Sequence, residues 1–250
     1  MDNGIITVAF GEDYDSMAAH TMWHSRQFTD LPIHVLTNIP EADRCDLWSE
    51  VPDITFTVFD MKQEENRFVK TQMLFHTPFA RTIYIDCDSL IQNPGIGRVF
   101  DRLEDHDMVL FRYYDWKPGD KVVAIAKRVM STAQETLPLE IYCGGFIGFT
   151  KSDKCRKCFD IWHSLWKATG GGREMIPLSC AVKKSQVNVS KTLSEHKIFE
   201  PESARLDVLI QHCYMNYRGK NWFKDFSIPE ITQCKPFDAT ANTDWTWVDM

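Results

Sequence analysis

The stretch "FARTIYIDCDSLIQNP", Phe79 to Pro94, decides the fold and poses the main functional question. Its apolar, β-rich run from Thr82 to Cys87 predicts a buried strand, which stops in Asp86-Cys87-Asp88. In an extended strand, Asp86 and Asp88 share one face while Cys87 points to the other. Two carboxylates held close together repel each other unless a cation lies between them. The stretch therefore predicts a site for a hard divalent cation, Mn²⁺ or Mg²⁺.

A plain turn explains the same residues. Under that interpretation Asp88 caps a turn, Asp86 is solvated, and neither side chain binds a ligand. The segments on either side of the stretch have to decide between the two interpretations.

Composition limits the class of protein. The 250-residue chain is 44% hydrophobic and 12% aromatic, which is ample for one sizeable core. Its formal net charge of -7 argues against a nucleic-acid-binding protein, and no Lys/Arg cluster predicts binding to an anionic membrane. The eight cysteines lie mostly in apolar segments, which is typical of reduced thiols. We expect no nucleic-acid partner.

The N-terminal sequence bears on location. The start, "MDNGIITVAFGEDYD", lacks the charged-then-apolar pattern of a signal peptide. No segment reaches the ~18 consecutive apolar residues that a membrane-spanning helix requires. We expect a cytoplasmic protein without a membrane span.

Upstream of the opening stretch, strands alternate with helices. Predicted strands cover Ile5–Phe10, Ile33–Thr37 and Ile54–Phe59, with a helix after the first of them. A further helix leads to Pro78 and then to the opening strand. Strands spaced by helices imply a mainly parallel, doubly wound mixed α/β sheet. The polar or small residues that close these three strands are Gly11, Asn38 and Asp60.

Downstream, the pattern continues without a break in composition. After a strand at Met108–Arg112 and a helix at Lys121–Met130, "EIYCGGFIGFT" predicts a strand interrupted at Gly144-Gly145. Such a glycine pair indicates either a bulge or close backbone approach to a ligand. Ser152 predicts an N-cap for the next helix. We therefore expect residues 1–250 to form a single domain.

The segment "FVKTQMLFHTPFARTIYIDCDSLI" resembles the approach to the D-x-D motif in nucleotide-sugar glycosyltransferases of the GT-A fold. In the glycogenin-like and bacterial galactosyltransferase-like group, a Lys on the preceding helix corresponds to Lys70. The opening "ITVAFGEDYDSMAAHTMWHSRQFTDLPIHVLTN" is similar to the first nucleotide-binding βαβ unit of such enzymes. The resemblance implies a single GT-A domain. Residues 1–94 would form a nucleotide-binding half that ends in D-x-D, and residues 95–250 the donor-sugar and acceptor half.

The resemblance also implies roles along the ligand-binding edge of the sheet. Asp86 and Asp88 would hold the cation and take part in catalysis. Lys70 would reach the donor phosphates, although a solvated helix charge explains it as well. Gly144 and Gly145 would let the donor sugar approach the backbone closely.

Nucleotide contacts are expected at the ends of the first three strands. Phe10 and Gly11 would hold the base through a ring and the main chain, and Asn38 or Asp60 would bind base or ribose. Ordinary strand ends and turn chemistry explain these four residues nearly as well.

Two further site residues depart from the group's pattern. The group's third metal ligand is a His with a Gly and a Lys-Pro after it, and here His212 is followed at a stretched spacing by Gly219 and Lys235-Pro236. Neutral imidazole is a normal ligand beside carboxylates, while an interior histidine is an equal alternative. The group's Asp-Gln pair is absent. Glu174 is the nearest acidic residue, and either binds acceptor hydroxyls or belongs to the first turn of a helix.

These expectations describe a metal-dependent glycosyltransferase that moves a sugar from a nucleoside diphosphate sugar, expected to be a UDP-sugar, to a glycan or other hydroxyl acceptor. The cation would stabilise the negative charge on the departing diphosphate. The resemblance favours a retaining enzyme. An inverting enzyme needs a base, for which Glu174 and Asp153 are the candidates.

Two other functions remain open from the sequence. A haloacid dehalogenase-type phosphatase would use Asp86 as its nucleophile, but that family places D-x-D near its N-terminus and follows it with Gly or a β-branched residue, whereas Ser89 stands here. A non-catalytic nucleotide-sugar-binding protein could keep the fold without the activity.

Overall fold

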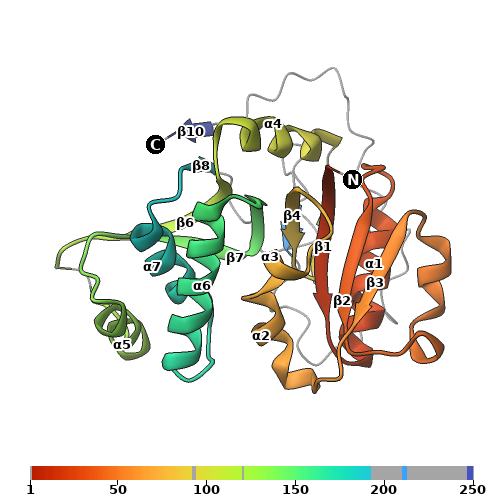
Figure 1. Cartoon of the computed structure of the whole chain (residues 1–250), viewed down its shortest axis with the longest axis horizontal. Coiled ribbons are helices and arrows are strands. Elements are labelled where there is room, and N and C mark those ends of the chain that lie inside the picture. The colour runs from red at the N-terminus through yellow and green to blue at the C-terminus, as the bar shows by residue number, and fades with distance from the viewer. Residues whose placement is uncertain (1, 92–93, 120, 193–209, 213–246, 250) are drawn as a thin grey trace, which may run out of the picture.

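A mixed sheet forms the centre of the molecule in the computed structural model, which describes residues 2–91, 94–119, 121–192, 210–212 and 247–249 (Figure 1). Within these residues the sheet has eight strands in the order β10-β8-β6-β7-β4-β1-β2-β3. Its strands are β1 (Asn3–Ala9), β2 (Ile33–Thr37), β3 (Ile54–Val58), β4 (Arg81–Ile85), β6 (Met108–Trp116), β7 (Leu139–Thr150), β8 (Val189–Thr192) and β10 (Trp247–Asp249).

The strand directions agree with the predicted sheet. Strands β3, β2, β1 and β4 run parallel to one another, and β6 and β8 form a further parallel pair. Strand β7 runs antiparallel to both β4 and β6, and β10 runs antiparallel to β8. The sheet is therefore mixed and mostly parallel. The carboxyl ends of β1, β2, β3 and β4 lie at one edge.

Helices cover both faces of the sheet, because side chains alternate across each strand. In β1, Ile6 and Val8 join one core, and Ile5 and Ala9 join the core on the opposite face. The first core includes α2 (Asn66–Lys70), α3 (Met73–His76), α6 (Asp153–Ala168) and α7 (Met175–Ser185), and the second includes α1 (Glu12–Ser25) and α4 (Arg98–Asp105).

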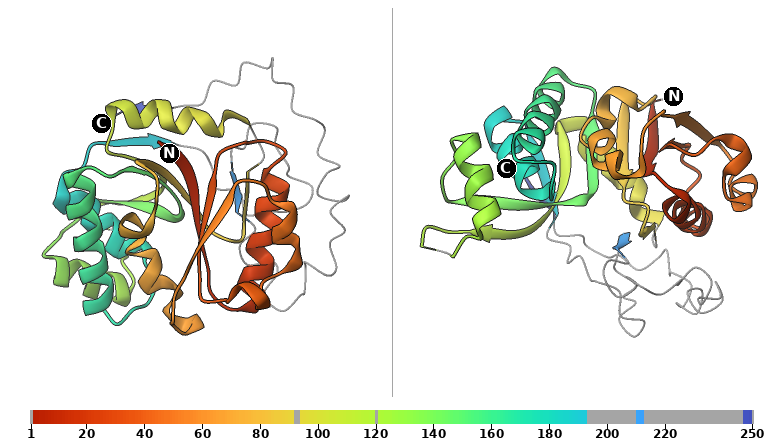
Figure 2. Two further views of the ribbon diagram at one scale, coloured as in Figure 1. Left: turned by 45° about the vertical axis from the view of Figure 1, so that its right-hand side comes forward. Right: turned by 90° about the horizontal axis from the view of Figure 1, so that it is seen from below.

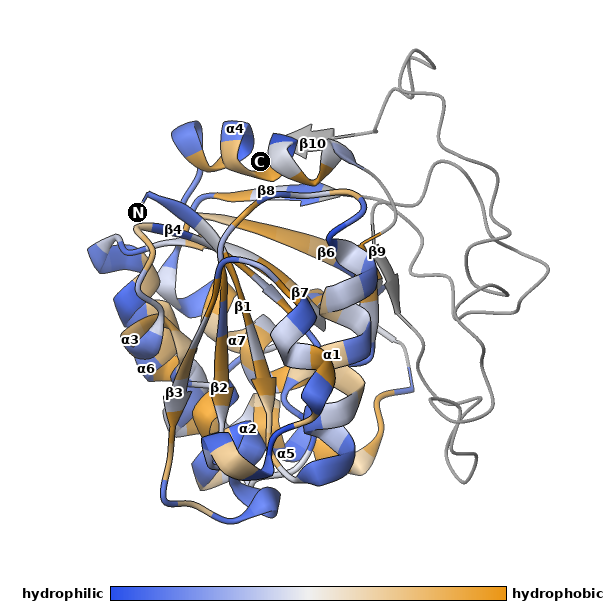
Figure 3. Cartoon of the chain, turned by 90° about the vertical axis from the view of Figure 1, so that its right-hand side faces the viewer, coloured by the Kyte–Doolittle hydropathy of each residue, from blue (hydrophilic) through white to orange (hydrophobic). Residues whose placement is uncertain are grey.

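Helix α5 (Ala124–Ala133) packs against α6 and α7 in a third cluster. In Figure 2 these three helices gather on the side of the molecule away from β2 and β3. Figure 3 shows the strands β1 and β6 as mainly apolar and the helices as mixed, as expected for a sheet buried on both faces. Short 3-10 helices complete the described part: Glu41–Asp43, Asp46–Glu50, Gln63–Glu65 and Pro94–Gly97.

Helix α6 confirms the predicted cap. The hydroxyl of Ser152 accepts a hydrogen bond from the Cys155 N–H at 3.2 Å, which satisfies an otherwise unpaired donor of the first turn. The apolar stripe of this helix is buried as predicted, at Cys155, Cys158, Phe159, Trp162 and Trp166.

Two local predictions were wrong. The single helix predicted before Pro78 is broken into α2 and α3 at Thr71-Gln72, where Gln72 has φ -118 and ψ 7. The side chain of Thr71 bonds to the Phe68 carbonyl and to His163 of α6, so contacts outside the segment fix the break.

The D-x-D segment was also predicted to be extended, and it is not. Strand β4 ends at Ile85, and the Ser89 N–H donates to the Asp86 carbonyl at 3.0 Å, which closes a turn over Asp86-Cys87-Asp88. The chain turns because β5 (Ser89–Ile91) leaves the main sheet and pairs with β9 (Ile210–His212) in a separate two-stranded sheet. Cys87 still lies on the α1 side, where its Sγ is 4.0 Å from Met17 Sδ, but strand alternation does not fix the direction of Asp88.

The predicted irregularity at Gly144-Gly145 is confirmed. Between the pairs Leu110–Ile147 and Arg112–Tyr142, β6 contributes only Phe111 while β7 contributes the segment 143–146. The Asp86 N–H donates to the Gly145 carbonyl at 3.0 Å. The bulge in β7 therefore lies beside the D-x-D turn.

No helix in the described part of the chain is long and apolar enough to cross a membrane.

Candidate functional site

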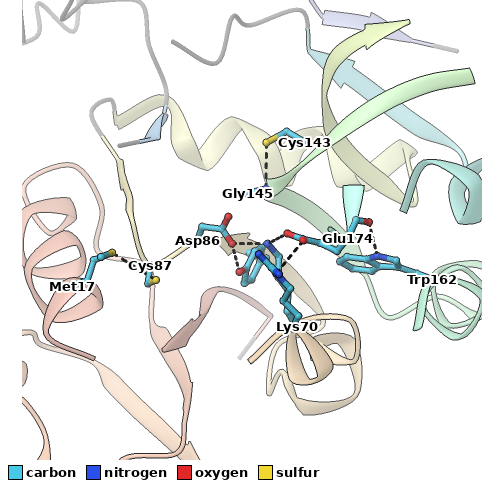
Figure 4. A network of polar contacts seen from close by, with 10 residues as sticks. Met17, Lys70, Asp86, Cys87, Cys143, Gly145, Trp162 and Glu174 are labelled. Carbon is cyan, nitrogen blue, oxygen red and sulfur yellow. Dashed lines mark hydrogen bonds and ion pairs between the residues drawn. The ribbon is translucent and has the colours of Figure 1, made fainter. Parts of the chain in front are cut away.

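Lys70 joins two of the other residues that the sequence singled out, Asp86 and Glu174. Its ammonium, at the end of α2, donates to Asp86 Oδ1 at 2.7 Å and to Glu174 Oε1 at 2.8 Å (Figure 4). The Lys70 side chain is only 7% exposed, and those of Asp86 and Glu174 are 22% and 13% exposed. The group lies at the carboxyl end of β4, which is the edge where open α/β sheets bind ligands.

The charges in this group stabilise one another. Burial alone would lower the pKa of Lys70, but Asp86 and Glu174 outweigh burial and raise that pKa well above its ordinary value. Burial would raise the pKa of Glu174, but the Lys70 ammonium lowers it overall. Lys70 is therefore protonated and Glu174 ionised at neutral pH.

Arg67 adds a second cation on the outer side of Glu174. Its Nε lies 3.5 Å from Glu174 Oε2, and its side chain is 45% exposed. Since Lys70 takes the other oxygen, each oxygen of Glu174 has a cationic partner. Arg67 and Lys70 lie three residues apart on α2, and both bind Glu174.

Tyr84 is a site residue to which the sequence analysis gave no role. Its hydroxyl donates to Asp86 Oδ1, the same oxygen that Lys70 binds, and the Lys70 ammonium lies 5.1 Å from the centre of its ring. Burial, reinforced by Asp86, raises the pKa of Tyr84 well above its ordinary value, so the hydroxyl stays a donor. The signal was present in the sequence, because residues two apart in a strand share a face.

Glu174 reaches the site from the N-cap position of α7. The Trp162 Nε1–H donates to its carbonyl at 3.0 Å, which anchors the turn before the helix. A Cβ on Gly144 would lie 3.2 Å from Glu174 Oε1, tighter than an ordinary contact. The missing side chain at Gly144 thus makes room for the Glu174 carboxylate, whereas the sequence analysis assigned that room to a donor sugar.

The residues predicted to bind a cation are Asp86, Asp88 and His212, and their binding of an ion stays a prediction. Asp86 and Asp88 are both partly exposed in the D-x-D turn, and Ser89 pairs with His212 in the β5–β9 register. The backbone of His212 therefore lies across from the residue that follows Asp88. The His212 side chain, Gly219 and Lys235-Pro236 lie outside the described residues.

The donor set of this turn suits a hard cation. Among the described residues, no three His, Cys, Asp or Glu side chains form a group that could hold a metal ion. Two carboxylates are nevertheless a normal protein contribution for Mg²⁺ or Mn²⁺, which take their remaining ligands from water and phosphate oxygens. The residues present therefore fit such an ion.

At the carboxyl ends of β1, β2 and β3, where nucleotide contacts were expected, Asn38 bonds within the protein. Its Oδ1 accepts from the Gly11 N–H at 2.7 Å and its Nδ2 donates to the Met61 carbonyl at 3.0 Å. The amide thereby ties together the segments that follow β1, β2 and β3. Gly11 has φ +92, and a Cβ there would lie 2.4 Å from the Gln63 side chain. Asp60 is exposed at the end of β3.

Phe10 does not offer its ring to a ligand, contrary to expectation. Its side chain is 0% exposed, and its ring lies 5.9 Å from that of Phe59 in the core on the α2 side. The reason is the alternation of β1, which places Phe10 on the same face as Ile6 and Val8. Only the main chain of Phe10 remains available at this edge.

Asp153 lies at the wrong end of the sheet to serve as a base. It begins α6 three residues after Thr150, which pairs with Arg81 at the start of β4. Asp86 follows the opposite end of the same strand. Of the two candidate bases, only Glu174 lies in the site.

Solved structures share this architecture. The galactosyltransferase LgtC, in a crystal structure with donor and acceptor sugar analogues, matches with a TM-score of 0.53 and 14% identity, over 77% of this chain and 73% of that chain. A second structure, an active-site mutant of LgtC, matches with a TM-score of 0.50 and 15% identity, over 72% of this chain and 70% of that chain. The protein has the GT-A fold. The sequence itself matches no protein-family model and no curated protein.

The GT-A fold confirms the fold class predicted from "YIDCDSLI" and its surroundings. GT-A glycosyltransferases typically use a divalent metal ion, which agrees with the donors in the D-x-D turn. At this level of identity, the likeness establishes the fold. The reaction has to be argued from the site.

Proposed function

We propose that the protein is a metal-dependent glycosyltransferase that moves a sugar from a UDP-sugar to a hydroxyl acceptor such as a glycan. The observation that carries this proposal is the group formed by Asp86, Lys70 and Glu174 at the ligand-binding edge of a GT-A sheet. A Mn²⁺ or Mg²⁺ ion held by Asp86, Asp88 and His212 would supply stabilisation of the negative charge on the leaving diphosphate.

Lys70 serves chiefly to hold the two carboxylates in place. An ammonium has three donors, and Asp86 and Glu174 take two of them. Because two carboxylates surround the one positive charge, Lys70 adds little net attraction for a diphosphate. This differs from a direct phosphate ligand, the role that the sequence suggested.

Glu174 serves as a hydrogen-bond acceptor for sugar hydroxyls. A general base works best when its pKa lies near the operating pH, whereas Lys70 lowers the pKa of Glu174. Glu174 is therefore poorly suited to act as a general base, which supports a retaining reaction, in which no dedicated base is required. The half-exposed Arg67 guanidinium beside Glu174 would close this part of the donor site.

Calorimetric titration with UDP-, GDP- and dTDP-sugars, with and without Mn²⁺, tests the proposal. We expect UDP-sugars to bind in the presence of Mn²⁺ and the binding to be lost in the Asp86→Ala/Asp88→Ala variant. Equal binding by this variant and the unaltered protein would contradict the assignment of the D-x-D turn. The Asp153→Ala variant is the matched control, because it removes a carboxylate at the opposite end of the sheet.

The same preparation addresses the two alternatives. A phosphatase of the haloacid dehalogenase type would turn over p-nitrophenyl phosphate and lose this activity in Asp86→Asn. The position of the D-x-D turn, after the fourth strand of a GT-A sheet, argues against this alternative. A non-catalytic binding protein would bind UDP-sugar with Mn²⁺ and neither hydrolyse nor transfer it. We expect slow UDP release in the absence of acceptor.

A further inference from the structure

Asp86 is fixed by hydrogen bonds to three other elements. The Tyr84 hydroxyl from β4 and the Lys70 ammonium from α2 both donate to Oδ1, the latter at 2.7 Å. The Asp86 N–H donates to the Gly145 carbonyl of β7 at 3.0 Å. The second carboxylate oxygen is turned away from Lys70 (Figure 4).

The hydroxyl of Tyr84 is not required for packing. The side chain is 2% exposed and belongs to the core on the α2 side. A phenylalanine would fill the same space without bringing a polar group that needs a partner. The hydroxyl therefore adds a polar contact to Asp86 beyond what the core demands.

This contact restricts how Asp86 presents its carboxylate. A carboxylate that rotates about its last side-chain bond can offer either oxygen to a ligand. Two donors on Oδ1 restrict that rotation, so that Oδ2 stays turned away from Lys70. Carboxylates that bind metal ions commonly rely on such hydrogen bonds from neighbouring groups for their orientation.

We propose that Tyr84 is a positioning residue, whose hydroxyl acts with Lys70 to orient Asp86 so that Oδ2 faces the cation and the donor diphosphate. This inference rests on the proposed function, because it assigns Asp86 to the binding of both. Tyr84 itself touches neither, and acts only through Asp86.

The chain provides a closely matched control in Tyr142. Its side chain is also 2% exposed, and its hydroxyl donates at 2.6 Å to Glu140 Oε2, again a carboxylate two residues away in the sequence. Tyr84→Phe and Tyr142→Phe each remove one hydroxyl from a buried ring. They differ in that only Tyr84 bonds to the D-x-D turn.

The test is calorimetric titration of the unaltered protein and both variants, first with Mn²⁺ alone and then with UDP in the presence of Mn²⁺. Melting temperatures are measured alongside, and titrations are run well below the lowest of them. We expect Tyr84→Phe to weaken Mn²⁺-dependent UDP binding about tenfold or more, and Tyr142→Phe to leave it unchanged to within about twofold. Both variants should lose similar thermal stability.

Two results would overturn the inference while the proposed function stands. One is equal binding by Tyr84→Phe and the unaltered protein. The other is equal weakening in both variants, which would mark the loss as a general effect of stability. If the unaltered protein binds no UDP with Mn²⁺, the proposed function itself fails, and this inference fails with it.

Discussion

At the scale of single residues, Lys70 carries a buried positive charge whose two partners are themselves largely withdrawn from water. Without that charge, the carboxylates of Asp86 and Glu174 would face each other across a buried space. Removing one partner of a buried ionic group lowers the free energy of unfolding far more than removing an exposed ion pair, because an uncompensated buried charge remains. The site and the stability of the fold are thus linked through one side chain.

Lys70→Met should therefore destabilise the protein by about 3–5 kcal/mol in the free energy of unfolding. The double variant Lys70→Met/Glu174→Gln removes one of the stranded carboxylates and should recover part of that loss. Urea unfolding followed by circular dichroism measures both. If the double variant were no more stable than Lys70→Met, the charges of Lys70 and Glu174 would not be coupled as the geometry indicates.

Gly144→Ala should lower turnover without preventing nucleotide binding. The added Cβ would come within 3.2 Å of Glu174 Oε1 and displace the carboxylate from its place beside Lys70. Turnover of UDP-sugar and the affinity for UDP with Mn²⁺ are the quantities to compare. Gly97→Ala is the control, since a Cβ there meets nothing within 4 Å. If UDP affinity fell as much as turnover, Glu174 would be needed for nucleotide binding as well, which would contradict this prediction.

The site residues show what a sequence can and cannot reveal. Asp86 and Lys70 lie 16 positions apart in one short segment, which the resemblance singled out, and the structure brings them into contact. The contact between Lys70 and Glu174 joins residues 104 positions apart, and no local pattern encodes it. Phe10 was misjudged because its place at a strand end was taken as exposure, whereas the alternation of β1 puts its ring in the core with Ile6 and Val8.

At the scale of elements, Asn38 holds together the segments that follow three parallel strands. Its two hydrogen bonds connect these segments beyond the last backbone hydrogen bonds between β1, β2 and β3. This edge of the sheet is therefore shaped by a side chain that the sequence analysis assigned to ligand binding.

Asn38→Ala should lower the free energy of unfolding by about 1–3 kcal/mol, because it leaves the Gly11 N–H and the Met61 carbonyl without their partner. UDP affinity should fall as well, since the segments after β1 and β3 lose their common anchor. Denaturant titration and calorimetry measure the two effects. Ser49→Ala removes an exposed hydrogen bond to Asp46 and should change neither. Unaltered UDP affinity in Asn38→Ala would separate this contact from the binding site.

The elements themselves follow from sequence where local patterns suffice. The five-residue strand Ile33–Thr37 is observed as predicted, because an apolar run with β-branched residues needs no distant contact to be recognised. The break between α2 and α3 was missed, because the Thr71 bond to His163 depends on how α6 docks. The end of β4 was missed for the same reason, since β9 lies more than a hundred residues further along the chain.

At the scale of the whole molecule, two buried histidines make the fold sensitive to acid. Burial lowers the pKa of His24 to about 4, and burial together with His76 lowers that of His34 to about 4. Between pH 6.5 and 4 the unfolded chain binds protons at these positions while the folded protein does not. Stability should therefore be unaffected by them above pH 6.5 and should fall as the pH drops towards 4.

Each histidine should contribute about 1.4 kcal/mol of lost stability per pH unit within that window. Urea unfolding at a series of pH values measures the slope. His24→Phe should reduce the slope, because phenylalanine does not bind a proton. The substitution suits the site, since the His24 ring packs 5.6 Å from that of Phe28 and its Nδ1 has no hydrogen-bond partner in the described structure. If the slope were the same with and without His24, the loss of stability in acid would not come from this residue.

The proposed reaction, transfer of a sugar from a nucleoside diphosphate sugar, is argued from the GT-A sheet, the D-x-D turn and the ionic group around Lys70. The most direct measurement is the release of UDP from UDP-sugars by the purified protein, with Mn²⁺ and with a chelator. We predict release that requires Mn²⁺ and disappears in Asp86→Ala/Asp88→Ala, while Asp153→Ala releases UDP as the unaltered protein does. Release that persists in the D-x-D variant, or no release from any nucleotide sugar with Mn²⁺ present, would contradict the account.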